Sequence, residues 1–229
     1  MGWLADFWRS SIGGKVTMAI TGALLFLFVV AHLLGNLQLL SGPQAINDYA
    51  RWLHERQSLL WAARIGLLAA FVLHVATGIR LAAGNRRARP VAYARPATVQ
   101  ATFASRSMVF SGLSLLAFVV YHLLHFTFGV TNPGDFARRA AHFDGNDVYA
   151  MVTASFGHPG IALVYVAFQS LLFLHLGHGL QSFCQTLGLD HPRYTPFVRK
   201  ASWVLAGLVS GGNIALALSV QIGLVAPTP

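Results

Sequence analysis

The chain has 229 residues, of which 55% are hydrophobic and 10% charged, and its mean hydropathy is +0.57. Soluble globular domains carry about 25% charged residues, so this composition excludes an ordinary soluble fold. Sixteen Lys and Arg against seven Asp and Glu give a formal charge of +9. These basic residues form no long run of the kind that binds nucleic acid. The composition predicts a polytopic membrane protein with no nucleic-acid partner.

Five segments are long and apolar enough to cross a bilayer, which takes about 20 residues. We expect the first to be retained, because it is too long for a signal peptide and no small-residue cleavage site follows it. Only the second contains charged residues, Arg64 and Arg80, near its ends, where long side chains reach the interface. The sequence predicts an all-α integral membrane protein, a single domain over residues 1–229, with spans over 16–40, 59–83, 107–130, 160–183 and 201–225.

The orientation follows from the basic residues, which are enriched in short cytoplasmic loops. They gather before the first span and in the second and fourth connections: Arg9, Lys15, Arg86, Arg87, Arg89, Arg95, Arg106, Arg193, Arg199 and Lys200. We therefore predict a cytoplasmic amino terminus. The first and third connections, predicted to lie outside, contain Asp48, Glu55, Asp135, Asp144 and Asp147. Residues 45–57 are predicted to form a short interfacial helix.

Histidines are the ionisable residues deep in the predicted spans: His32, His74, His122, His125, His175 and His178. Polar residues at this depth are costly, so six together indicate a function. At 1.5 Å per residue, His32 and His122 lie roughly 25 Å from the inner ends of their helices, and His74 and His175 roughly 16 to 18 Å. Two pairs at two depths predict two stacked haems, each iron held between two imidazoles. Cys184 is the single cysteine and no C-x-x-C-H sequence occurs, so these haems would be held without a thioether link.

The remaining polar candidates have less specific roles. His125 and His178 follow two of the predicted ligands by three positions, nearer the membrane surfaces, and are predicted to bond haem propionates. An exchange of roles within either pair stays open. Glycines near the histidines suit either a flat macrocycle or close helix packing: Gly35, Gly78, Gly177 and Gly179. His142, His158 and His191 are interpreted as interfacial. Four residues are candidates for the vicinity of a quinone headgroup, with interfacial anchoring as the alternative: His54 and Glu55 outside, Ser11 and Lys15 inside.

Over nearly its whole length the chain resembles the five-helix, two-haem cytochrome b membrane-anchor subunit of succinate dehydrogenases and fumarate reductases. The segments that carry this resemblance occur in order: SSIGGKVTMAITGALL and AHLLGNLQL, LHVATGIRL, VVYHLLHFTFG, DVYAMVTASFGHPGIALVYV and LHLGHGLQSFCQTLGL. The resemblance implies that His32 and His122 ligate an outer haem b and that His74 and His175 ligate an inner one. It also implies that the first four helices form the haem-binding bundle.

The same resemblance implies partners and a reaction. Family members anchor a flavoprotein with FAD and an iron-sulfur subunit on the cytoplasmic face of a bacterial-type cytoplasmic membrane. Electrons then pass between the iron-sulfur subunit and a membrane quinone, expected to be menaquinone, while this chain binds no succinate itself. Glu55 is the only glutamate and a candidate for proton exchange near the outer haem.

Three alternatives remain at this point. The chain is compatible with the cytochrome b subunit of a hydrogenase, formate dehydrogenase or nitrate reductase, because shared architecture is not shared function. A zinc site fits less well, since zinc takes three or four ligands at one level. A transporter with a histidine-lined path is less favoured, because we find neither a proline inside a span nor an internal repeat.

Overall fold

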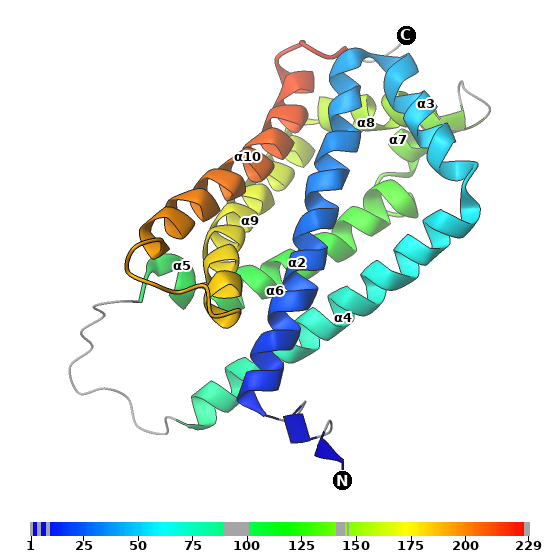
Figure 1. Ribbon diagram of the computed structural model, residues 1–229. Coiled ribbons are helices and arrows are strands. Elements are labelled where there is room, and N and C mark those ends of the chain that lie inside the picture. The colour runs from blue at the N-terminus through cyan, green and yellow to red at the C-terminus, as the bar shows by residue number, and fades with distance from the viewer. Residues whose placement is uncertain are drawn as a thin grey trace.

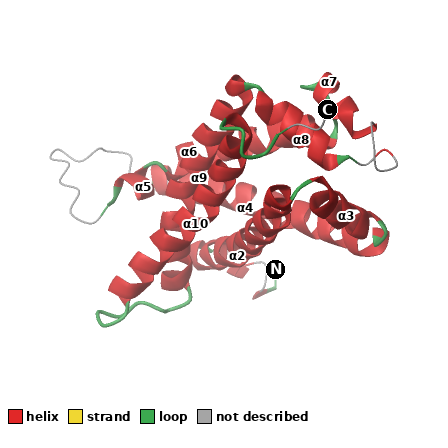
Figure 2. Ribbon diagram, turned by 90° about the horizontal axis from the view of Figure 1, so that it is seen from above, coloured by secondary structure: helices red, strands yellow, loops and turns green. Residues whose placement is uncertain are grey.

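The computed structural model of the chain is helical (Figure 1) and describes residues 2–3, 6–7, 10–88, 101–140, 145 and 147–226. No strand occurs within these residues, which Figure 2 shows as helices and loops. Five of the described helices are long and apolar enough to cross a membrane. This confirms the predicted all-α, five-span membrane protein. Sequence interpretations of Arg9, Arg89, Arg95, His142 and Asp144 fall outside the described residues.

The spanning helices differ from the predicted spans mainly at their ends. Their bounds are α2 (Ser11–Asn36) with the 3-10 turn η1 (Leu37–Ser41), α4 (Gln57–Arg87), α6 (Met108–His122) with the π-helical turn η2 (Leu123–Thr127), α9 (Pro159–Thr186) and α10 (Thr195–Gln221). The Ser10 hydroxyl caps α2 by accepting from the backbone N–H of Gly13 at 3.0 Å, so the first helix begins before residue 16. The fifth begins at Thr195, ahead of residue 201, with Pro196 in its first turn.

Shorter helices close one end of the bundle. They are α3 (Pro43–His54), α7 (Pro133–Ala137), the 3-10 turn η3 (Arg138–Ala140) and α8 (Val148–Gly157), while α5 (Phe103–Arg106) precedes α6. Helix α3 confirms the short helix predicted within 45–57, whereas α7 and α8 were not predicted. Gly42, at φ +101°, turns the chain from η1 into α3. Figure 1 shows α3, α7 and α8 at the end where the chain finishes, opposite the amino terminus. We call these the outer and inner ends, following the predicted orientation.

The apolar core also lies at the outer end, under α3 and α8. Its members include Leu33, Leu39, Ile46, Phe118, Tyr149, Phe156, Tyr165 and Leu216. A buried polar bridge joins the two covering helices: Nδ2 of Asn47 donates to Oδ1 of Asp147 at 2.9 Å, and the backbone N–H of Tyr149 donates to Oδ1 of Asn47 at 3.1 Å. Helix α4, in contrast, buries only Ala70 and Thr77, as expected for a helix that faces lipid.

Candidate functional site

Four histidines from the first four spanning helices meet as two pairs. The ring centroids of His32 and His122 lie 5.9 Å apart, and those of His74 and His175 lie 6.5 Å apart. Imidazole nitrogens lie about 2.0 Å from a bound transition metal such as zinc, so two imidazoles on opposite sides of one ion have centroids roughly 6 Å apart. Both pairs therefore have a spacing that would let two imidazoles hold one metal ion between them. These are the pairs expected from depth and from the resemblance.

The inner pair, His74 and His175, has its protons fixed by neighbouring hydroxyls. Thr21 on α2 donates its hydroxyl proton to a carbonyl of its own helix at 2.7 Å, so its oxygen accepts from Nδ1 of His74, 3.1 Å away. Ser111 on α6 does the same: it donates to a carbonyl at 3.2 Å and accepts from Nδ1 of His175 at 3.1 Å. A proton on Nδ1 leaves the Nε2 lone pair of each histidine available to a metal.

A glycine follows each of these hydroxyl residues and gives the histidine ring room. A Cβ added to Gly22 would lie 3.2 Å from Cε1 of His74, and one added to Gly112 would lie 3.4 Å from Cε1 of His175. Each inner histidine thus packs its ring edge on a glycine of the neighbouring helix while that helix accepts its Nδ1 proton.

The two hydroxyl-glycine pairs belong to an internal repeat. Residues 21–32, TGALLFLFVVAH, align with residues 111–122, SGLSLLAFVVYH, and six of the twelve positions are identical. In each copy a phenylalanine one turn before the last histidine packs against it: Phe28 and His32 have ring centroids 5.5 Å apart, and Phe118 and His122 5.9 Å. The expectation that the chain has no internal repeat was therefore wrong, because the two copies are short segments that lie inside single spans.

The two histidine levels are farther apart than expected. Thr21, level with His74, precedes His32 by 11 positions, which corresponds to about 16 Å along α2. Depths counted from Lys15 and from Arg86 implied about half of this. The two reference residues do not lie at one level, because Gly14, near the start of α2, already lies beside Arg80 of α4. Helix α4 therefore extends several residues farther toward the inner end than α2.

The residues next to the predicted ligands have distinct environments. His125 is 1% exposed, and both of its ring nitrogens have hydroxyl partners, so bonding a propionate would require one of these bonds to be exchanged. His178 is half-buried and makes no hydrogen bond to a described residue. Gly35 lies against the ring of Tyr49, and Gly177 against Trp203, so these two glycines serve helix packing.

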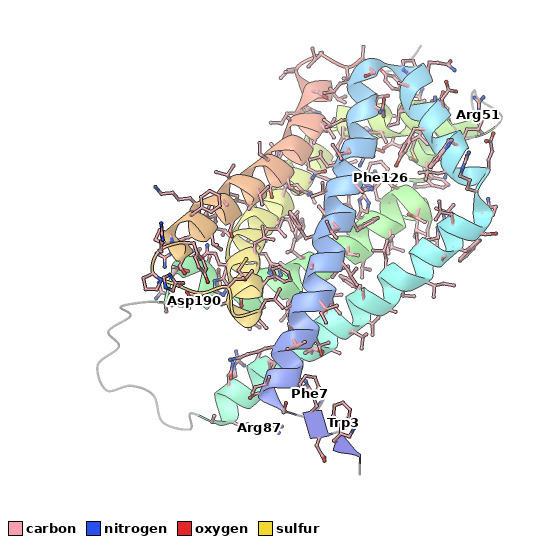
Figure 3. The ribbon with its side chains drawn as sticks, in the orientation of Figure 1. Trp3, Phe7, Arg51, Arg87, Phe126 and Asp190 are labelled. Atoms are coloured by element: carbon pink, nitrogen blue, oxygen red, sulfur yellow. The ribbon has the colours of Figure 1, made fainter. Side chains whose placement is uncertain are left out.

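The four residues expected near a quinone lie at opposite ends of the bundle. His54 donates from Nδ1 to the carbonyl of Ala50 at 2.8 Å, and the exposed Glu55 carboxylate lies 3.9 Å from Arg56, both at the end of α3. Ser11 and Lys15 are exposed at the start of α2. In Figure 3 the labelled Arg51 on α3 and Arg87 on α4 mark these two ends, and Phe126 lies between them, inside the bundle.

A compact metal site of the zinc type does not form among the described residues, where no three His, Cys, Asp or Glu side chains gather around one point. The histidines meet only two at a time. This pattern matches a metal whose remaining positions are filled by a macrocycle.

Sequence reasoning missed Thr21, Ser111 and Tyr165, whose hydroxyls orient three of the four paired histidines. Threonine, serine and tyrosine are unremarkable in membrane helices, so their type alone carries no signal. The repeat over 21–32 and 111–122 would have identified the first two, because it places a hydroxyl residue and a glycine at the same distance from a histidine in both copies.

Residues 8–84 match the family model for the succinate dehydrogenase/fumarate reductase transmembrane subunit. The matched part covers α2, η1, α3 and most of α4, and so includes one histidine of each pair, His32 and His74. No curated protein and no solved structure matches the chain. The match supports a transmembrane subunit of the succinate dehydrogenase/fumarate reductase family.

Proposed function

We propose that this chain is the cytochrome b membrane anchor of a succinate dehydrogenase or fumarate reductase. It holds an outer haem b between His32 and His122 and an inner haem b between His74 and His175. The bound haems would supply electron transfer between an iron-sulfur subunit and a membrane quinone, expected to be menaquinone. The chain takes part in the quinone reaction of the complex without binding succinate.

One observation carries this proposal: two histidine pairs lie about 16 Å apart along the bundle, each with a spacing suited to one iron. In the inner pair the hydroxyls of Thr21 and Ser111 hold both rings with Nε2 unprotonated. A histidine that is only hydrogen-bonded or packed needs no such arrangement. The occurrence of this arrangement twice in one bundle supports a pair of haems. When bound, haem supplies one-electron chemistry.

The chain's own residues would hold the haems and pack beside their histidine ligands. With two imidazoles to hold each haem, the bound groups would supply electron transfer in preference to oxygen binding. Phe28 and Phe118 pack against the outer pair, while the glycines at 22 and 112 let the inner rings approach the neighbouring helices. Packing of this kind, together with hydrogen bonds to the ligands, would set the reduction potentials of the bound haems.

The family match supports catalytic partner subunits. A flavoprotein with FAD and an iron-sulfur protein would dock at the inner end, where the described basic residues Arg86, Arg87, Arg106, Arg199 and Lys200 lie. For the quinone headgroup the candidates remain His54 and Glu55 at the outer end and Ser11 and Lys15 at the inner end. The location that follows is a bacterial-type cytoplasmic membrane, with the amino terminus inside.

The test is a dithionite-reduced minus oxidised absorbance spectrum of the full chain in membranes or detergent, with haem quantified per polypeptide. We expect two b-type haems in the wild type and one in each of His32→Ala and His74→Ala, with different spectra for the haem that remains. His191→Ala is the matched control, since His191 stacks on Tyr194 in the connection before α10 and is expected to leave both haems in place. A folded wild type without haem would refute the proposal and return the histidines to a structural or transport role.

The identity of the partner needs a separate measurement. Copurification of a flavoprotein that reduces the haems with succinate would support the succinate dehydrogenase assignment. Reduction of the haems by hydrogen or formate, or their oxidation by nitrate, with no response to succinate or fumarate, would instead identify a hydrogenase, formate dehydrogenase or nitrate reductase subunit.

A further inference from the structure

A line of hydrogen-bonded side chains connects the outer histidine pair to the short helices at the outer end. The phenolic oxygen of Tyr165 on α9 lies 3.3 Å from Nδ1 of His122 and 3.0 Å from Nδ1 of His125. Nε2 of His125 lies 3.1 Å from the hydroxyl of Ser155 on α8, which donates to Oδ2 of Asp135 on α7 at 3.2 Å. We call Tyr165, His125, Ser155 and Asp135 the outer relay.

The chemistry of the groups orders the protons in this relay. An ionised carboxylate only accepts, so the single hydroxyl proton of Ser155 points to Asp135 and the Ser155 oxygen accepts from Nε2–H of His125. Neutral His125 then accepts at Nδ1 from the hydroxyl of Tyr165. With its own proton used, the Tyr165 oxygen accepts from Nδ1–H of His122. This sequence of donors and acceptors, which starts at Asp135, places the proton of His122 on Nδ1 and leaves its Nε2 unprotonated.

Three features of the fold build the relay. The turn η2 is π-helical, with the N–H of Phe128 bonded to the carbonyl of Leu123 at 2.9 Å, and this wider turn leaves His122 and His125 both facing Tyr165. Helix α8 buries Ser155 completely. Asp135 is 16% exposed at its side chain and lies 3.5 Å from Nε2 of the surface residue His158.

Burial strengthens the hydrogen bonds of the outer relay. His125 and Ser155 are 1% and 0% exposed, and Tyr165 is 6% exposed, so no water competes for their polar atoms. Hydrogen bonds in such surroundings are stronger than in water and polarise one another along a chain. A ligand histidine whose second nitrogen donates into a chain of this kind becomes a more basic ligand.

We propose that the four relay residues are positioning residues that hold His122 with its proton on Nδ1 and lower the reduction potential of the outer haem. The relay acts through His122 and touches no reacting atom. A more basic imidazole favours the ferric state, so the relay makes the outer haem a stronger reductant than the His32–His122 pair alone would make it. This inference rests on the proposed function, because it requires a haem at the outer pair.

The test is a redox titration of the haems in membranes containing the full chain, with the outer haem assigned by its loss in His32→Ala. Tyr165→Phe keeps the ring, which packs against Phe118 and Phe156, and removes the hydroxyl that accepts from His122 and donates to His125. We expect the outer potential to shift upward and the inner potential to stay unchanged, with an altered low-spin electron paramagnetic resonance signal for the outer haem alone. Asp135→Asn removes the charge at the far end and is expected to shift the outer potential in the same direction by a smaller amount.

Tyr149→Phe is the matched control, because Tyr149 is also buried at the outer end but bonds the carbonyl of Ala226 at 2.9 Å and lies outside the relay. Both potentials should stay unchanged in this variant. Two bound haems with an unmoved outer potential in Tyr165→Phe would overturn the relay, as would a shift in Tyr165→Phe with none in Asp135→Asn. Absence of haem from the wild type would instead be the failure of the proposed function.

Discussion

The hydroxyl oxygen of Thr21 on α2 lies 3.1 Å from Nδ1 of His74 on α4, although 53 residues separate them in the chain. Ser111 and His175 repeat this relationship between α6 and α9 at the same distance. Each proposed ligand of the inner haem is thus oriented by a different helix from its own. The spacing of the inner pair therefore depends on the packing of four helices.

This dependence leads to the first prediction, for Thr21→Val. Valine has nearly the same shape but offers no acceptor, so the Nδ1–H of His74 loses its partner. Loss of such a second bond typically weakens metal binding about 10- to 100-fold. We expect weaker retention of the inner haem during dialysis and an upward shift of its potential, measured by haem quantification and redox titration. Thr17→Val is the control, because the Thr17 hydroxyl bonds only a carbonyl of its own helix. Equal haem retention in the two variants would contradict the orienting role of Thr21.

The second prediction concerns the room for the His74 ring. A Cβ on residue 22 already comes within 3.2 Å of Cε1 of His74, so the two methyl groups of Gly22→Val would displace the ring from its position. We expect the haem content per polypeptide to fall from two toward one, with the outer haem retained. Gly66→Val on α4 serves as the control, since nothing lies within 4 Å of a Cβ there. A Gly22→Val chain that still carries both haems would show that the ring is not confined by α2.

The sequence predicted the five spans, the short helix within 45–57 and the histidine pairs, because apolar length and helical rise are local properties. It missed the start of α2 by several residues, since hydropathy marks the apolar part of a helix, whereas the Ser10 cap marks where the helix begins. It overestimated the depth of His74 because α2 and α4 do not end at one level.

The partners of the histidines were harder to predict than the histidines themselves. Thr21, Ser111 and Tyr165 come from other helices, and which face of a helix meets a neighbour depends on packing that one span does not encode. The outer relay also needs α7 and α8, which arise in a connection with too few apolar residues to form a span. Only the 21–32 and 111–122 repeat offered a usable signal in the sequence.

The third prediction concerns the bridge between α3 and α8. Asn47→Ala removes the donor to the buried Asp147 carboxylate and the acceptor for the Tyr149 N–H, so both groups lose partners in a site closed to water. Hydrogen bonds to charged groups contribute about 1.5–3 kcal/mol, and we expect the free energy of unfolding to fall by about this amount. Denaturant titration in detergent measures this free energy.

Gln44→Ala, which removes an exposed bond to Asp48, is the control and should change stability by less than about 0.5 kcal/mol. A similar small change in Asn47→Ala would mean that water replaces the bridge.

The fourth prediction separates helix packing from haem binding on α9. Gly177 lies directly against the ring of Trp203 on α10, whereas Gly179, two positions later, has nothing within 4 Å of a Cβ. Gly177→Ala forces Trp203 away from its place beside Phe173, and overpacking of this kind costs about 1–3 kcal/mol. Gly179→Ala should leave stability unchanged or raise it slightly, because alanine has a higher helix propensity than glycine.

Both variants should bind two haems, since α10 contributes no proposed ligand. Thermal unfolding and the absorbance spectrum are therefore measured together. Loss of the inner haem in Gly177→Ala at unchanged stability would mean that Gly177 makes room for the macrocycle and does not serve the contact between α9 and α10.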